Sequence, residues 1–125
     1  MQTVFVFGNP LVEEDSIALL TAEKLRGMKG FEFHEIESLG ELEEIPNELI
    51  ILDCAEGAEK IEVLSDLKKI AHEKKFSLHD FDLAGYLQLL HELGNIRKII
   101  IIGIPQKGNI EEIKTDLLRL LPVDF

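Results

Sequence analysis

The segment Leu49-Ile50-Ile51-Leu52, followed directly by Asp53-Cys54-Ala55, is the clearest indication of the fold class of this 125-residue chain. Four consecutive apolar residues leave no polar face, so a strand built from them has to be covered on both sides. This pattern is typical of a central strand in a parallel sheet, because helices bury both of its faces. A second segment of the same kind, Ile99-Ile100-Ile101-Ile102, ends at Gly103-Ile104-Pro105. The two segments predict two fully buried strands.

Three shorter segments complete the predicted sheet. Residues 3–7 form an apolar run that ends at the turn residues 8–10, and they predict a buried strand. Residues 31–36 are partly polar, which places that strand nearer an edge. Residues 61–63 predict a short edge strand.

Helical patterns lie between these strands. Apolar residues recur at roughly helical spacing at Ile17, Leu20, Leu25 and Met28, and Gly27 and Gly30 end this first helix. A second helix is predicted from Asp82 to Leu93, closed by Gly94, with one apolar face formed by Leu83, Tyr86, Leu87 and Leu90.

The last helix is predicted to open at Asn109. Glu112 follows three residues later, as in a capping box, and Ile113, Leu117 and Leu121 then face inward. Alternation of strands and helices indicates an α/β fold, a three-layer sandwich with a mostly parallel five-stranded sheet and helices on both faces. No linker, repeat or low-complexity run interrupts the pattern, so residues 1–125 are predicted to be a single domain.

The composition indicates a cytoplasmic protein. A hydrophobic content of 46% supports a core without disulfides. The single cysteine, Cys54, excludes an intramolecular disulfide framework and a multi-cysteine zinc site. We expect no signal peptide, because Met1-Gln2-Thr3 has no basic region, and no membrane span, because no apolar stretch approaches about 20 residues. A monomer is expected.

The net charge of −11 is concentrated in one half of the chain. Residues 1–59 carry 14 acidic and 3 basic side chains, whereas residues 60–125 carry 10 of each. Such a surface repels nucleic acid and anionic lipid, since cationic side chains supply most of the affinity for phosphate. It would attract a cationic metal or a basic peptide. The alternative is that the excess carboxylates only keep the protein soluble.

Three residues are candidates for a functional site at the carboxyl ends of the strands, where ligands bind in open α/β sheets. Asp15 lies in the loop or first helical turn after the strand at 3–7, Asp53 ends the strand at 49–52, and His79 precedes the Asp82 helix. Each also has a purely structural interpretation. Asp15 would suit a helix N-terminus, Asp53 the end of a buried strand, and His79 a surface or capping position.

The remaining histidines and the cysteine are interpreted as structural. His34 shares the polar face of its strand with Glu32, and His91 flanks the apolar face of its helix. Cys54 would be a nucleophile only with a paired base, so we expect it to be a small buried residue.

Four segments resemble, in order, the signatures of the hydrogenase maturation endopeptidases. They are Val4-Phe5-Val6-Phe7-Gly8-Asn9-Pro10-Leu11 with the acidic residues up to Asp15, Leu49-Ile50-Ile51-Leu52-Asp53-Cys54-Ala55, Ser77-Leu78-His79-Asp80, and Ile99-Ile100-Ile101-Ile102-Gly103. The resemblance covers nearly the whole chain.

The resemblance implies an endopeptidase that removes the C-terminal extension from the precursor of a nickel–iron hydrogenase large subunit after nickel insertion. It also implies that Asp15, Asp53 and His79 contact the metal and carry catalysis. Two carboxylates and an imidazole suit nickel or zinc and leave coordination positions open. We expect the nickel to arrive with the substrate, although zinc or another divalent metal would bind in vitro.

Some residues depart from the family pattern. Glu14 stands where the family has Asp, Ala18 where it has Gly, and Glu37-Ser38-Leu39-Gly40 where it has a Gly-Gly-Thr loop. Because of the altered loop, an alternative remains that the protein is a non-proteolytic relative, which binds a hydrogenase subunit as an assembly module. A flavodoxin-like phosphate binder is a further alternative from the fold alone, but the acidic residues 13–15 would repel phosphate.

Overall fold

The computed structural model describes residues 2–7, 16–28, 30–36, 47–66, 68–69 and 83–121. Within them the strands are β1 (Gln2–Val6), β2 (Phe31–Glu35), β3 (Glu48–Ala55), β4 (Glu62–Leu64) and β5 (Lys98–Pro105). The helices are α1 (Ser16–Lys24), α3 (Leu83–Glu92) and α4 (Ile110–Leu118).

The five strands form one sheet in the order β2-β1-β3-β5-β4. The β1–β2, β1–β3 and β3–β5 pairs are parallel, and only β4 runs antiparallel to its neighbour β5. The predicted α/β fold with a mostly parallel five-stranded sheet is therefore confirmed. The two doubly apolar segments belong to β3 and β5, which pair over eight residues in the interior of the sheet, and β2 and β4 are edge strands as expected.

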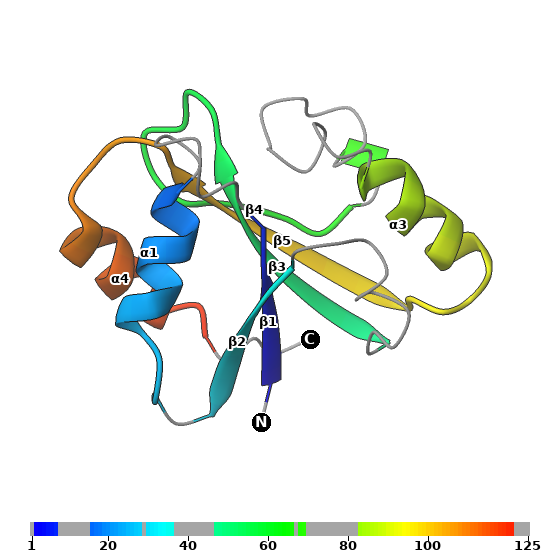
Figure 1. Cartoon of the computed structure of the whole chain (residues 1–125). Coiled ribbons are helices and arrows are strands. Elements are labelled where there is room, and N and C mark those ends of the chain that lie inside the picture. The colour runs from blue at the N-terminus through cyan, green and yellow to red at the C-terminus, as the bar shows by residue number, and fades with distance from the viewer. Residues whose placement is uncertain are drawn as a thin grey trace.

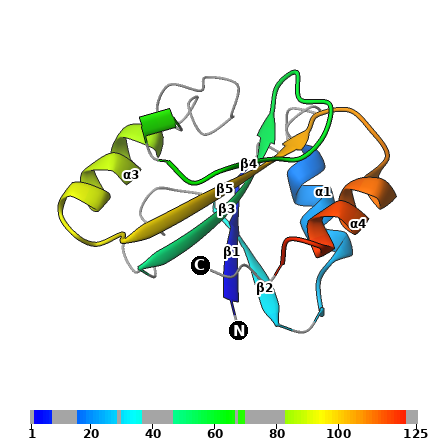
Figure 2. The same cartoon turned by 180° about the vertical axis from the view of Figure 1, so that it is seen from behind.

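Helices cover both faces of the sheet: α1 and α4 lie together on one face and α3 lies on the other, in the view of Figure 1 and from behind in Figure 2. Alternate residues of β3 serve the two layers, as the pleat requires. Leu49 and Ile51 pack in the cluster that contains Leu87 of α3. Ile50 and Leu52 pack in the cluster that contains residues of α1 and α4.

The predicted inward face of α1 is partly wrong. Leu20 and Met28 are 48% and 42% exposed, whereas Ala18 and Ala22 are completely buried. The helix ends at Lys24, so Leu25 and Met28 lie beyond its last turn. Small residues let this helix lie close against the sheet and α4, and the apolar periodicity of its large residues did not reveal that face.

The other two helices follow the prediction closely. In α3, Leu87 and Leu90 are buried and Tyr86 is half-buried, and Gly94 beyond its end has the positive φ of 82° that a helix-closing glycine adopts. Ile113, Leu117 and Leu121 of the last segment are buried as predicted. In the described ranges, every helix is too short or too polar to span a bilayer.

Asn109 caps the N-terminus of α4, as the sequence predicts. The Asn109 Oδ1 accepts hydrogen bonds from the backbone N–H groups of Glu111 at 2.8 Å and Glu112 at 3.3 Å. Asn109→Ala should therefore lower the free energy of unfolding by about 1 kcal/mol, measured by urea denaturation. Asn109→Asp keeps an accepting oxygen and should retain wild-type stability, and an equal loss in both variants would contradict the capping role.

Candidate functional site

Asp53 lies near the carboxyl end of β3, the strand at the centre of the sheet. It is 0% exposed and is one of two buried polar residues among those described, the other being Thr21. Because Leu49 and Ile51 face α3, Asp53 continues that alternation and turns to the same layer. A carboxylate buried in an apolar layer costs free energy unless polar partners or a cation compensate it, so its retention here needs an explanation.

Part of that compensation is local. The Asp53 Oδ1 accepts a hydrogen bond from the backbone N–H of Cys54 at 2.8 Å. Cys54 is itself 1% exposed and packs in the α1 and α4 layer, which confirms its prediction as a small buried residue.

Asp53 belongs to a row of neighbouring residues across the carboxyl end of the sheet. The Phe7 N–H donates to the Leu52 carbonyl at 2.8 Å, which extends β1 to lie beside Asp53. On the other side Asp53 is in register with Gly103 of β5, and Gly103 with Glu62 of β4. Residues in register point to the same face, so Asp53 and Glu62 flank a position that has no side chain.

Glu62 is a carboxylate near the carboxyl end of the sheet, and the sequence analysis did not single it out. The chain leaves β3 through a turn in which the Ala58 N–H donates to the Ala55 carbonyl at 3.2 Å and Gly57 has a φ of 77°. It then returns as β4, antiparallel to β5, so the first residue of β4 stands level with Gly103. The pattern of residues 61–63 predicted a strand but did not indicate its direction. The antiparallel direction of β4 is what brings Glu62 to the carboxyl end of the sheet.

The other two predicted site residues, Asp15 and His79, lie outside the described residues. Within the described part of the chain, no three His, Cys, Asp or Glu side chains are grouped closely enough to hold a metal ion. The convergence of Asp15, Asp53 and His79 on one point therefore stays a prediction.

Of the two described histidines, His34 is at the surface as predicted, and His91, predicted to flank the apolar face of its helix, is exposed as well. His34 is exposed, and its ring lies edge-on to Phe5 with the ring centroids 5.6 Å apart. His91 is also exposed, and its Nδ1 lies 2.9 Å from the Ile96 carbonyl. Since a carbonyl oxygen only accepts, this nitrogen carries the proton.

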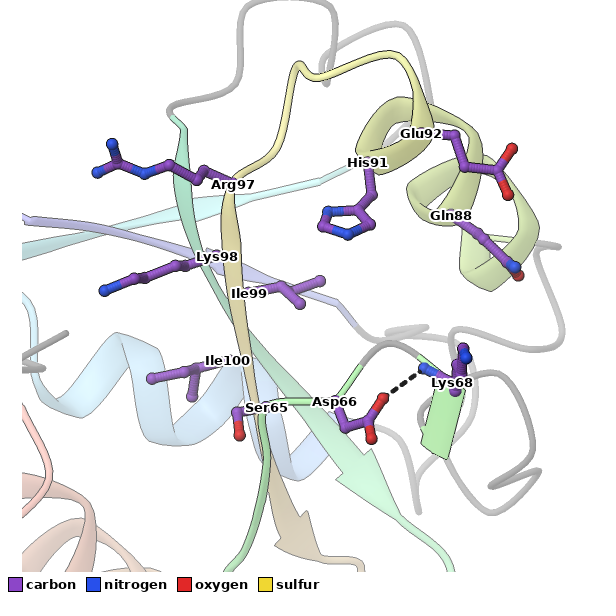
Figure 3. A pocket seen from close by; sticks show the side chains of 10 residues that line it. All are labelled: Ser65, Asp66, Lys68, Gln88, His91, Glu92, Arg97, Lys98, Ile99 and Ile100. Atoms are coloured by element: carbon purple, nitrogen blue, oxygen red, sulfur yellow. Dashed lines mark hydrogen bonds between the residues drawn. The ribbon is translucent and has the colours of Figure 1, made fainter.

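A cavity of about 770 Å³ lies away from Asp53, beside the amino end of β5 (Figure 3). Its lining includes Asp66, Lys68, His91, Lys98, Ile99 and Ile100. The cavity is wide enough for a ligand, but it is three residues or more along β5 from the row that contains Asp53 and Gly103. Size alone therefore does not locate the chemistry, and the buried carboxylate at the carboxyl ends is the stronger indication.

Comparison with solved structures identifies the same fold in three endopeptidases. The hydrogenase maturating endopeptidase HybD from Escherichia coli is 21% identical, with a TM-score of 0.69 over 97% of this chain and 92% of that one. The [NiFe] hydrogenase maturation protease HybD from Thermococcus kodakarensis is 17% identical, with a TM-score of 0.68 over 96% and 99%. The endopeptidase HycI from Escherichia coli is 22% identical, with a TM-score of 0.66 over 97% and 89%. At these identities the likeness shows the fold alone.

The sequence itself carries the family assignment. No curated protein matches the chain. A family described as "HycI: Hydrogenase maturation protease" matches residues 33–121, well over half of the chain, and this span includes Asp53 and His79 but begins after Asp15. The chain belongs to the hydrogenase maturation protease family.

Proposed function

We propose that this protein is an endopeptidase that removes the C-terminal extension from the precursor of a nickel–iron hydrogenase large subunit after nickel has been inserted. The family match over residues 33–121 is the observation that carries the proposal. The buried carboxylate of Asp53 supports it, because α/β proteins bind ligands at the carboxyl ends of the strands, where Asp53 lies.

Asp15, Asp53 and His79 are proposed to contact the nickel of the substrate. The donor set fits such an ion, since carboxylate oxygens and an imidazole nitrogen bind nickel while leaving positions for ligands from the precursor. Asp53 suits this role because its carboxylate is completely buried near the carboxyl end of the central parallel strand. A bound cation would also offset the cost of burying its charge.

The site is proposed to recognise nickel that the precursor already holds. Two carboxylates and one imidazole form a weaker cage than a set of thiolates, and the one cysteine of the chain, Cys54, is buried in the opposite layer. The precursor would bind productively only once its nickel completes the site. Water would then attack the carbonyl carbon of the scissile bond, and the released amine would take up the proton as the carbon–nitrogen bond breaks.

Two measurements test nickel recognition. Protein purified without added metal should hold far less than one equivalent of nickel or zinc after a chelator wash, measured by elemental analysis. It should process nickel-loaded precursor, followed by the change in precursor mass, and leave nickel-free precursor and unrelated peptides intact. A tightly held metal together with hydrolysis of an unrelated peptide would instead identify a self-contained metallopeptidase.

The alternative is an assembly module that binds a hydrogenase subunit without cutting it. It rests on Glu37-Ser38-Leu39-Gly40, which replaces the Gly-Gly-Thr loop expected from the family resemblance and lies outside the described residues. The same assay separates the two functions, because an assembly module would bind the nickel-loaded precursor and leave its mass unchanged.

A further inference from the structure

Within the described part of the chain, the amino half of β5 forms an open sheet edge. β5 spans eight residues, but β4 pairs only with Ile101, Ile102 and Gly103. Within the described ranges, no strand pairs with Lys98, Ile99 and Ile100 on the β4 side. An open edge of this kind is a template on which another extended chain is able to pair.

The main chain of Ile99 faces this open side. The Lys98 N–H donates to the Asn47 carbonyl at 3.0 Å, and Asn47 immediately precedes β3, the neighbour on the other side. Backbone groups alternate in direction along a strand. Ile99 therefore turns its N–H and C=O away from β3, toward the edge that β4 leaves uncovered.

The cavity of about 770 Å³ runs along this same edge (Figure 3). Lys98 and Ile100 point to one side of β5, and His91 and Lys68 lie on the side of α3. An added strand places successive side chains on opposite faces, and here both faces would meet lining residues of the cavity. Ile100, half-buried and apolar, would be covered by such a strand.

The charges along this edge select an acidic partner. Lys98 and Lys68 make no ion pair within the described residues, whereas the neighbouring Arg97 pairs with Glu48 at 3.6 Å. The acids that line the cavity, Asp66 and Glu92, lie on the α3 side, away from Lys98 (Figure 3). Salt screens the net charge of −11 beyond about 8 Å. Within that distance Glu48 is in register with Lys98 and pairs with Arg97, so Arg97 and Lys98 together outweigh it by one positive charge.

We propose that the open edge at Lys98–Ile100 docks an extended segment of the precursor, which adds to the sheet as a strand and places an acidic side chain against Lys98. This inference rests on the proposed function for the identity of the partner. Ile99 is four residues from Gly103, the register partner of Asp53, or about 13 Å along the strand. Because β4 occupies the edge from Ile101 to Gly103, a segment docked at Ile99 would leave the edge there and cross the face of the sheet that carries Asp53 to reach the candidate site. The edge would then act as a selector of substrate.

The kinetic test compares Lys98→Glu with Lys114→Glu in the full chain. Lys98 is exposed, so its reversal should leave the fold intact. Lys114 lies on α4 outside the lining of the cavity, and its reversal changes the net charge equally. Lys98→Glu should raise KM for nickel-loaded precursor roughly tenfold and leave kcat unchanged, as expected for lost docking. Lys114→Glu should match the wild type.

A binding measurement separates failure of this inference from failure of the proposed function. Amide hydrogen exchange of the wild-type protein is followed with and without nickel-free precursor, and residues 97–101 should gain protection. Protection there supports docking even if the protein cuts nothing. Equal KM values for the two variants, a fall in kcat alone for Lys98→Glu, or unchanged exchange at residues 97–101 would each overturn it. Lys98 would then only keep the edge from pairing with other chains, as edge lysines commonly do.

Discussion

Asp53→Asn is expected to lower processing of the nickel-loaded precursor by about 100-fold or more, while the free energy of unfolding changes by less than about 1.5 kcal/mol. Asparagine has nearly the shape of aspartate, and its Oδ1 is still able to accept the N–H of Cys54. What disappears is the negative charge, which is the feature that a nickel-contacting residue needs. Processing is followed by the mass of the precursor and stability by urea denaturation.

Asp116→Asn is the matched control for this variant. Asp116 is a carboxylate on α4 that lies 3.6 Å from Arg119. Its side chain is exposed to solvent, whereas that of Asp53 is buried. It should lose no processing activity and little stability, since exposed ion pairs contribute about 1 kcal/mol or less. Full activity in Asp53→Asn would remove Asp53 from the site. A stability loss of several kcal/mol would make Asp53 a determinant of the fold instead.

The largest loss of stability is expected from Leu52→Ala. Leu52 is completely buried on the central strand, in register with Val6 of β1 and Ile102 of β5. Truncating such a leucine removes its apolar contacts and leaves a cavity, which together cost about 3 kcal/mol. That is a large fraction of the roughly 5–15 kcal/mol that stabilises a typical domain.

The measurement uses urea denaturation followed by far-ultraviolet circular dichroism, because the chain contains no tryptophan. Leu89→Ala is the control, since Leu89 on α3 is 51% exposed and its truncation should change stability by less than about 0.5 kcal/mol. If the two variants lost equal stability, Leu52 would not be packed in the buried core between β3 and the helices α1 and α4.

The fold could be predicted because its central strands carry a signal that only one environment explains. The four apolar residues of β3 and the four isoleucines of β5 are stable only between two covering layers. The buried face of α1 was harder to predict from the sequence. Ala18 and Ala22 are buried, while the larger Leu20 is exposed to solvent. Periodicity weighs residues by hydrophobicity, whereas close packing of a helix also depends on small size.

Only part of the candidate site could be predicted from the sequence. Asp53 was a candidate because an acid directly after a doubly apolar strand has few structural reasons to be there. The structure shows that it is completely buried, and its role in the site stays a prediction. Glu62 could not be identified, since its position depends on β4 running antiparallel to β5. The open edge at Lys98–Ile100 was equally hidden, because it arises from the shortness of β4 against the length of β5.

The β3–β5 ladder also has a consequence for how the chain folds. It joins Glu48 to Lys98 and every later residue of β3 to the one fifty positions further on. Pairing over such a sequence distance requires a long loop to close, and the chain loses this entropy before the strand contacts contribute favourable free energy. Folding is slowed as a result. During that delay Leu49–Leu52 and Ile99–Ile102 are exposed to solvent, and runs of this kind are prone to aggregate. Arg97 and Lys98, directly before the four isoleucines, are gatekeeper charges that oppose aggregation of the unfolded chain.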